Sequence, residues 1–379
     1  MQAPLGVTEA DVVTVLQAVL DRHAMLRLRV DDSTGTWALH VPEPGTVDAR
    51  NCLHTIDTLT DDAVAHARSQ LNPRTGTMLS ALWVKPTSEL VLIAHHLAVD
   101  GVSWRILLED LNLAWTQHRN GQPVTLPTPG MSFAGWSALL PGRARQPGVV
   151  AHTQAWQQIA ATSGALPAVR PDSDTLGTAG NLSVDLDVET TELLLGEVPA
   201  AFHAGINDVL LIAFGLALAE FLGEPGAISI DVEGHGREEE LGSGNEVIDL
   251  SRTVGWFTAK YPVALTLGGL SWAQVVSGAA ELGTVLKDAK EQLRTVPDGV
   301  TYGLLRYLND DVDLDGPDPS IGFNYLGRLG GTGGRATAQP TEAWQISWDC
   351  LANVNTHHDL SAPLAHTVEL NAGTVDTAA

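Results

Sequence analysis

The chain has 379 residues, of which 44% are hydrophobic and 17% are charged, and its formal net charge is −24. This composition is typical of a globular protein with a sizeable core and excludes a fibrous or largely disordered chain. The excess of acidic residues would repel nucleic acid and anionic membranes at long range, so we expect neither as a partner. The length is enough for two or three domains.

The cysteines and the apolar segments indicate the cellular compartment in which the chain is expected. The two cysteines, Cys52 and Cys350, lie far apart in sequence, which excludes a small disulfide scaffold and favours a reducing cytoplasm. The first thirteen residues lack the basic and apolar regions of a signal peptide. The longest apolar run, 209–219, is too short to cross a bilayer and predicts a buried helix.

The first part of the chain predicts alternating helices and strands. Thr8, with Asp11 three residues later, predicts the cap of a first helix. Apolar residues then alternate with polar ones on both sides of a turn, which predicts a hairpin over 25–41. Periodicity predicts the following elements next: a helix over 60–71, strands over 81–84 and 90–94, and a helix over 102–117.

A second series of elements follows a loop over 141–147, which holds Arg143 and Arg145. The stretch 163–180 is rich in Pro, Gly, Ser and Asp, and there we place a boundary between subdomains 1–165 and 166–379. The elements predicted around it are a helix near 149–162, a strand over 182–188, helices near 190–198 and over 206–222, and a strand over 227–233. The mixed order of strands and helices predicts an α/β fold, an α+β sandwich.

The most informative stretch, 90–111, reads LVLIAHHLAVDGVSWRILLEDL. An apolar strand ends at His95 and His96, a turn contains Asp100 and Gly101, and a helix follows. Adjacent strand residues point to opposite faces, so one histidine can face a cavity while the other is held in the interior. A base beside a helix N-terminus suits removal of a proton next to a carbonyl group, since the free N–H groups can stabilise the enolate oxygen. A zinc site usually needs three converging ligands, which disfavours a metal at two diverging histidines.

This stretch closely resembles the second core motif of epimerization domains of nonribosomal peptide synthetases. Condensation domains, which are their relatives, share only the HHxxxDG part, whereas the longer form HHLAVDGVSWRIL is typical of epimerization. Four further stretches resemble motifs of the family, in the family's order. They are IDVEGHGRE at 230–238, RTVGWFTAKYPVAL at 252–265, PDGVTYGLLRYL at 297–308 and GFNYLGR at 322–328. The resemblance begins near Val7 and covers nearly the whole chain.

The resemblance implies a fold of two chloramphenicol-acetyltransferase-like subdomains in a V-shaped pseudo-dimer. It also implies inversion at the Cα of an aminoacyl or peptidyl thioester, carried on the phosphopantetheine arm of a carrier domain. His96 and Glu233 match the motif positions for two proton-transfer groups, one in each subdomain, and a desolvated Glu233 would be the stronger base. The implied partners are the carrier domain and neighbouring adenylation and condensation modules.

Other residues of these motifs are interpreted as supporting ones. We expect Asp100 to hold the loop of His95 and His96 through an ion pair with Arg237, and Tyr325 either to contact the intermediate or to be a core residue with a satisfied hydroxyl group. Ser103 lacks a GxSxG elbow and is interpreted as a capping residue of the helix. We expect no bound cofactor, because pyridoxal chemistry would need a Schiff-base lysine and a phosphate cradle.

Two further sequence patterns are too weak to predict a functional site. The glycine-rich run 330–334 lacks the Lys-Ser/Thr of a phosphate loop, and the sequence His357-His358-Asp359 lacks the strand–turn–helix context of the main motif. Both are expected to be loops.

Several alternatives stay open at this point. The family normally has a further segment before the first helix and more strands after Asn371, so both ends resemble truncations. The alternatives to epimerization are an amide-forming condensation domain, which would use the same histidine, and an inactive docking remnant. Because carrier domains are often acidic as well, docking would depend on apolar contacts and local arginines, with Arg143 and Arg145 as candidates.

Overall fold

The computed structural model describes residues 1–33, 35–128, 130–162, 164–223, 226–239, 248–329, 343–346 and 360–375. The chain divides into two compact units. Unit 1 comprises Met1–Ala138, Arg237–Phe257 and Gly330–His358, and unit 2 comprises Leu139–Gly236, Thr258–Leu329 and Asp359–Ala379. The mixed α/β class predicted from the sequence is confirmed.

The boundary predicted over 163–180 differs from this division, because it lies within unit 2. The polar stretch packs along a distant part of the same unit: the Leu176 amide donates to the Ala362 carbonyl at 2.9 Å. Composition marks a segment with few apolar residues, but it does not show whether the segment is held by backbone hydrogen bonds.

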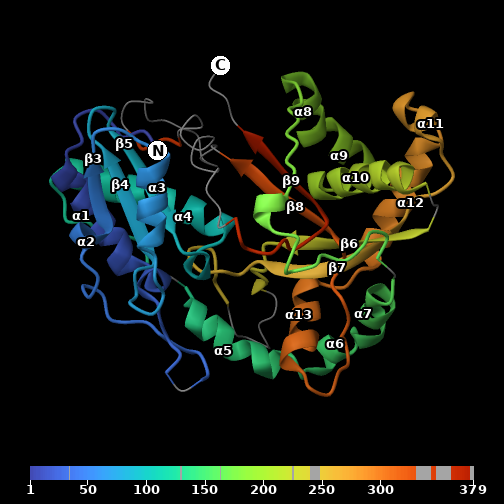
Figure 1. The fold of residues 1–379 in the computed structure, drawn as a ribbon, viewed down its shortest axis with the longest axis horizontal. Helices are drawn as coiled ribbons and strands as arrows, with labels where there is room; N and C mark the ends of the chain where they lie inside the picture. Colours follow the sequence, from blue (N-terminus) through green and yellow to red (C-terminus); the bar gives the residue numbers. More distant parts are fainter. Residues whose placement is uncertain are drawn as a thin grey trace. The chain divides into compact units, whose positions relative to one another are not determined.

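Helices and strands alternate in mixed order (Figure 1). The elements of unit 1 are α1 (Glu9–Arg22), η1 (Ala24–Arg27), β1 (Arg29–Asp31), β2 (Ala38–His40), α2 (Ala49–Cys52), β3 (Leu53–Ile56), α3 (Asp61–Ser69), β4 (Leu79–Val84), β5 (Glu89–Ala94), η2 (His96–Ala98) and α4 (Gly101–Arg119). Helix α5 (Phe133–Arg143) contains the first change of unit. The elements of unit 2 are α6 (Pro147–Val150), α7 (Thr153–Ala160), η3 (Leu176–Thr178), α8 (Val188–Leu195), α9 (Glu197–Phe202), α10 (Ile206–Leu222), β6 (Ala227–Gly234), β7 (Ala259–Thr266), α11 (Trp272–Val276), α12 (Leu282–Thr295), α13 (Gly299–Leu308), β8 (Ile321–Leu329) and β9 (Val368–Val375).

Unit 1 contains a three-stranded sheet with β4 in the centre, parallel to β3 and antiparallel to β5. Every residue of β4 is buried, because helices cover both faces of the sheet. Leu79, Ala81 and Trp83 belong to the core formed with α1 and α4, whereas Leu82 packs with Val64 of α3. Alternate side chains of β4 thus contribute to two apolar layers, one on each face of the sheet. The last residue of β5, Ala94, pairs with the first residue of β4, Leu79. The His95–His96 motif begins directly after Ala94, at this edge of the sheet.

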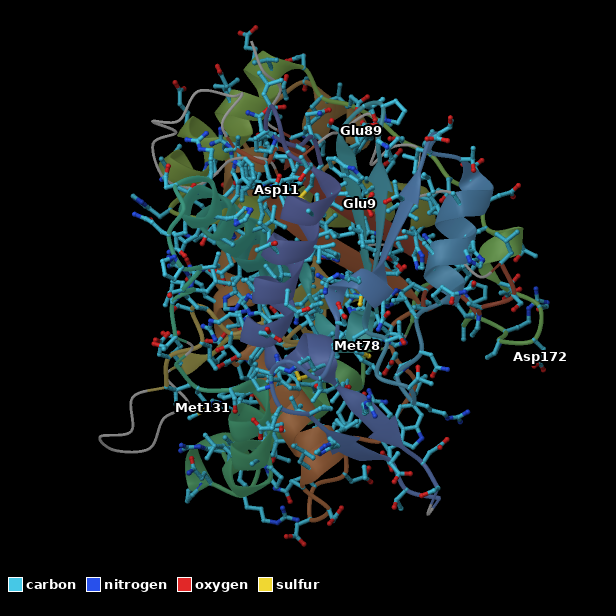
Figure 2. All side chains as sticks on the ribbon, turned by 90° about the vertical axis from the view of Figure 1, so that its left-hand side faces the viewer. Glu9, Asp11, Met78, Glu89, Met131 and Asp172 are labelled. Carbon is cyan, nitrogen blue, oxygen red and sulfur yellow. The ribbon has the colours of Figure 1, made fainter. Side chains whose placement is uncertain are left out.

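The start of α1 matches the sequence prediction. Thr8 is the N-cap, and its backbone N–H donates to the Asp11 carboxylate at 2.9 Å, which completes a capping box. Glu9 and Asp11 are both in the first turn of this helix, on either side of it in Figure 2, and their negative charge complements the helix dipole.

Unit 2 contains a four-stranded sheet in the order β7-β6-β8-β9. Alternate residues of β6 face opposite ways. Ile228, Ile230 and Val232 belong to an apolar core with α10 and α12, which cover one face of the sheet (Figure 1). The intervening residues Ser229, Asp231 and Glu233 therefore lie on the opposite face. The second face of β6 therefore presents polar and charged side chains.

The hairpin predicted over 25–41 forms only in part. Strands β1 and β2 pair antiparallel, but residues Ala24–Arg27 form a 3₁₀ helix instead of the start of a strand. Arg27 is one of the polar residues in the predicted alternation, yet it is buried, and its guanidinium donates to the Asp21 and Pro42 carbonyls at 2.8 and 3.1 Å. The acceptors are one carbonyl in the last turn of α1 and one that follows β2, so tertiary contacts override the alternating pattern.

The strand predicted over 182–188 is wrong. Residues 181–187 form no strand, and α8 already begins at Val188. The alternating apolar residues Leu182, Val184 and Leu186 are 92%, 74% and 55% exposed. Alternation indicates a half-buried strand only where a sheet and an apolar layer receive the side chains.

The loop predicted over 141–147 is also shorter than expected, because α5 continues through Pro141 to Arg143. Arg143 is only 4% exposed and therefore cannot be part of a docking surface. Arg145 is exposed, and its guanidinium donates to the Leu308 carbonyl at 3.0 Å.

Candidate active site

The strand–turn–helix predicted over 90–111 is present as β5, η2 and α4. His95 caps η2: its Nδ1 accepts a hydrogen bond from the Leu97 amide at 3.2 Å, and its own amide donates to the Met78 carbonyl at 2.9 Å. Burial, and then the neighbouring His96, lower the pKa of His95. A neutral His95 with Nδ1 as acceptor carries its proton on Nε2, so this histidine has a defined structural place.

His96 differs from His95 because its side chain is exposed. Its imidazole lies against the indole ring of Trp256, with ring centroids 4.5 Å apart. Both residues belong to unit 1. Of the two histidines, His96 is thus the one that is open to a substrate, as the divergence of adjacent residues predicted.

Asp100 is buried and organises the turn after the histidines. It is the N-cap of α4, where its Oδ1 accepts the Ser103 amide at 2.7 Å, and its Oδ2 accepts the Phe257 amide at 3.1 Å. Nη2 of Arg237 lies 3.0 Å from Oδ1, so the expected ion pair is present. That this pair supports the fold rather than proton transfer stays a prediction.

Two expectations about this helix start need correction. Asp100, not Ser103, caps α4; the Ser103 hydroxyl instead bonds the Gly255 carbonyl and amide at 3.0 and 3.1 Å. The Asp100 carboxylate also accepts the Ser103 amide, so this one N–H group of the helix N-terminus is not available to an enolate. At Gly101 an added Cβ would meet no atom within 4 Å, so packing does not explain a glycine there.

Glu233, the second predicted proton-transfer residue, lies in unit 2. Glu233 is the penultimate residue of β6, and Nδ2 of Asn324 on β8 donates to its Oε2 at 3.0 Å. Glu233 is exposed rather than desolvated, which differs from the buried carboxylate that the sequence predicted. The carboxylate is therefore accessible, and the Asn324 amide bonds one of its oxygens.

Tyr325 lies beside Asn324 in β8, so its side chain points to the opposite face of the sheet. It packs against the apolar core of unit 2, and its hydroxyl lies 3.2 Å from Oγ1 of Thr374. Of the two interpretations of Tyr325, this placement favours a core residue with a satisfied hydroxyl group. Sequence reasoning selected Tyr325 and missed Asn324, although strand alternation in the FNYLG motif separates the two.

A charged cluster lies on the same face of β6 as Glu233. Asp231 is buried, with Lys260 Nζ at 2.9 Å and His366 Nε2 at 3.1 Å from its Oδ2. Lys260 also lies 2.7 Å from Oδ2 of Asp318, and His366 Nδ1 lies 3.3 Å from Oε2 of Glu369. These contacts connect β6, β7 and β9 and thereby fix the strand that presents Glu233. The sequence offered no signal for this cluster, because Asp231, Lys260, Asp318 and His366 are distant from one another in the chain.

The cluster shifts the pKa values of its members. Burial lowers the pKa of His366, but hydrogen bonds to Asp231 and Glu369 outweigh it and raise the pKa to about 9. For Lys260 burial is likewise outweighed by Asp318 and Asp231, which raise its pKa well above the usual range. Both groups are therefore positively charged at neutral pH.

The described residues show neither a metal-binding cluster nor a single membrane-spanning helix. Within those ranges no group of three His, Cys, Asp or Glu side chains is placed to hold a metal ion. No single described helix is long and apolar enough to span a bilayer. Among the described residues, one pair of helices, 188–202 with 206–222, is together long and apolar enough, but it bends by 95°.

Two patterns noted in the sequence, His357-His358-Asp359 and the run 330–334, lie outside the described residues.

Comparison with known proteins identifies the family. Residues 3–360 match the condensation domain model. The chain belongs to the condensation domain family. Bacitracin synthase 2 of Bacillus licheniformis is 32% identical over 338 residues, which are 86% of this chain and 12% of that protein. Surfactin synthase subunit 1 of Bacillus subtilis (strain 168) is 38% identical over 273 residues, 69% of this chain and 7% of that protein. This condensation-family chain thus spans a small fraction of the length of these relatives.

Solved structures agree with this assignment. The epimerization domain from the third module of tyrocidine synthetase B is 26% identical with a TM-score of 0.81, over 98% of this chain and 82% of that one. The SgcC5 protein from Streptomyces globisporus is 18% identical with a TM-score of 0.61, over 85% of this chain and 72% of that one. The second likeness shows the fold alone.

Proposed function

We propose that this condensation-family chain epimerizes the Cα of an aminoacyl or peptidyl thioester carried on the phosphopantetheine arm of a carrier domain. The observation that carries the proposal is the similarity to a solved epimerization domain at a TM-score of 0.81 over 98% of the chain. The motif forms HHLAVDGVSWRIL and EGHGRE support the same subtype. Carrier, adenylation and condensation modules are the partners that this function requires.

The proposed chemistry needs two proton-transfer groups. One group removes the Cα proton, and the C–H electron pair moves into the thioester as an enolate; the other group returns a proton to the opposite face of Cα. His96 and Glu233 are the proposed groups, since both side chains are exposed, His96 shortly after β5 and Glu233 near the end of β6. Asn324, which donates to Glu233, is proposed to orient that carboxylate. The step consumes no oxidant and needs no bound cofactor.

Amide formation by a condensation domain is the second candidate, because the matching family model is that of condensation domains. It would use the same exposed His96 as a base, but it would have no need for a second proton-transfer group at Glu233. The two functions therefore predict different products and different sensitivities to Glu233.

The test uses the full chain with carrier protein loaded, in separate reactions, with several L-aminoacyl and L-peptidyl groups. In heavy water we expect deuterium at Cα and a D/L mixture after hydrolysis of the thioester. The variants His96→Ala and Glu233→Gln should each slow this exchange, whereas Glu239→Gln, an exposed acid six residues later, serves as control. Absence of exchange with every loaded group, combined with amide product from two charged carriers, would establish condensation instead.

A further inference from the structure

The surroundings of Trp256 contrast with its exposure. Its neighbours Val254 and Phe257 are 4% and 6% exposed, yet the indole is 44% exposed and lies against His96. The two ring planes are inclined by 50°. An exposed indole gains less stabilisation from burial than a tryptophan in the core. Core packing therefore does not explain its position beside the exposed histidine.

The backbone on both sides of Trp256 is fixed to the start of α4. Gly255 is held by its amide and carbonyl to the Ser103 hydroxyl, and the Phe257 amide donates to Asp100. The Phe257 ring lies 5.0 Å from the Phe133 ring and 4.1 Å from the guanidinium carbon of Arg237. The Trp256 Cα is thus anchored to the same residues that follow the histidine motif.

The backbone of this loop packs closely against the Phe133 ring. A Cβ added to Gly255 would lie 2.4 Å from Cδ2 of Phe133, closer than real Cβ contacts. Arg252, four residues before Trp256, lies 3.1 Å from Glu109 of α4 and pairs with Asp110 as well. A rigid loop of this kind can hold a side chain within the narrow limits that proton transfer requires.

We propose that Trp256 is a positioning residue for His96, holding the imidazole ring in one orientation through ring contact. The proposal rests on the proposed function, because it takes His96 to be a proton-transfer group. An aromatic face restricts the rotation of the imidazole and attracts its protonated form, which arises once the ring has accepted a proton. Trp256 itself exchanges no proton with the substrate in this scheme.

The test compares aromatic and non-aromatic side chains at position 256. We expect Trp256→Leu and Trp256→Gln to lower kcat for Cα exchange about 10-fold with KM nearly unchanged, since misplacement of a reacting group acts on the chemical step. Trp256→Phe should retain most of the activity. The matched control is Trp37→Leu, which removes a 71% exposed tryptophan from the same unit. Two non-aromatic variants are used so that poor folding of one leaves the other.

A second measurement detects the ring contact without catalysis. In histidine-labelled full chain, the His96 ring resonance is identified by its absence in His96→Gln. We expect this resonance to move in Trp256→Leu, where the ring current of the indole is lost, and to keep its position in Trp37→Leu.

Two results would overturn the positioning role: an unmoved His96 resonance, or a rise in KM with unchanged kcat, which would make Trp256 a substrate contact. If the wild-type chain exchanges no proton with any loaded carrier, the proposed function fails, and the resonance still decides whether the contact exists.

Discussion

Nδ2 of Asn324 lies 3.0 Å from Oε2 of Glu233, so an amide on β8 orients the carboxylate near the end of β6. We expect Asn324→Ala to lower the rate of Cα exchange about 10-fold, the equivalent of one hydrogen bond to a charged group, while the unfolding midpoint stays unchanged. Rates measured with loaded carrier protein in heavy water check this. Asn371→Ala is the matched control, because Asn371 is opposite Asn324 in the sheet and bonds Glu369 instead.

The ion pair of Asp100 and Arg237 is buried, with 2% and 8% of the two side chains exposed. We expect Asp100→Ala to lower the free energy of unfolding by about 3–5 kcal/mol, because the buried guanidinium loses its contact with the Asp100 carboxylate and α4 loses its cap. Urea denaturation checks the value. The double variant D100N/R237Q should lower the free energy of unfolding by less than the sum of the losses in D100N and R237Q.

A surface pair provides the control for this prediction. Arg294 is 57% exposed and lies 3.2 Å from Glu291. Arg294→Ala should leave the unfolding midpoint nearly unchanged, because solvent screens such pairs. Equal losses from Asp100→Ala and Arg294→Ala would contradict the assignment of Asp100 as an anchor.

Gly255 has the Phe133 and Phe257 rings where a side chain would be, 2.4 and 3.1 Å from an added Cβ. We expect Gly255→Ala to destabilise unit 1 by about 1–3 kcal/mol through overpacking. The same change should slow Cα exchange, since Trp256 is the next residue. Thermal unfolding and exchange rates are the measurements.

The matched control is Gly283→Ala in α12, where an added Cβ meets nothing within 4 Å. Because alanine favours a helix over glycine, this variant should gain up to about 1 kcal/mol. A Gly255→Ala chain as stable and as active as the Gly283→Ala chain would show that the loop adapts.

Elements with strong local signals were predictable from the sequence. The Thr8–Asp11 capping box and the long apolar run of α10, Ile206–Leu222, have the predicted bounds because caps and helical periodicity act within a few residues. Strands β4, β5 and β6 were also found, since each combines an apolar run with a turn.

The failures concern contacts between residues far apart in the chain. The alternation at Leu182–Leu186 predicted a strand, but a strand also needs a neighbour, and local sequence does not reveal whether one is present. The contact of His96 with Trp256 and the bond of Asn324 to Glu233 join residues 160 and 91 positions apart. Motif letters identified His96 and Glu233 by family resemblance, whereas their supporting residues required the fold.

His366 connects the stability of unit 2 to pH. Its hydrogen bonds to Asp231 and Glu369 outweigh burial and raise its pKa from the ordinary 6.5 to about 9 in the folded chain. A proton bound more tightly in the folded state stabilises it fully below pH 6.5, and this contribution is lost as the pH rises from 6.5 toward 9. The shift corresponds to roughly 3 kcal/mol at most.

We therefore expect the free energy of unfolding to fall between pH 6.5 and 9 and His366→Asn to flatten this slope. Of the groups around His366, Glu369 has a lowered pKa and Lys260, which is connected to His366 through Asp231, has a raised one, so neither accounts for a slope in this range. Urea denaturation at several pH values measures it, with the exposed His40→Asn as control. A slope that persists in His366→Asn would place the titrating group elsewhere in the chain.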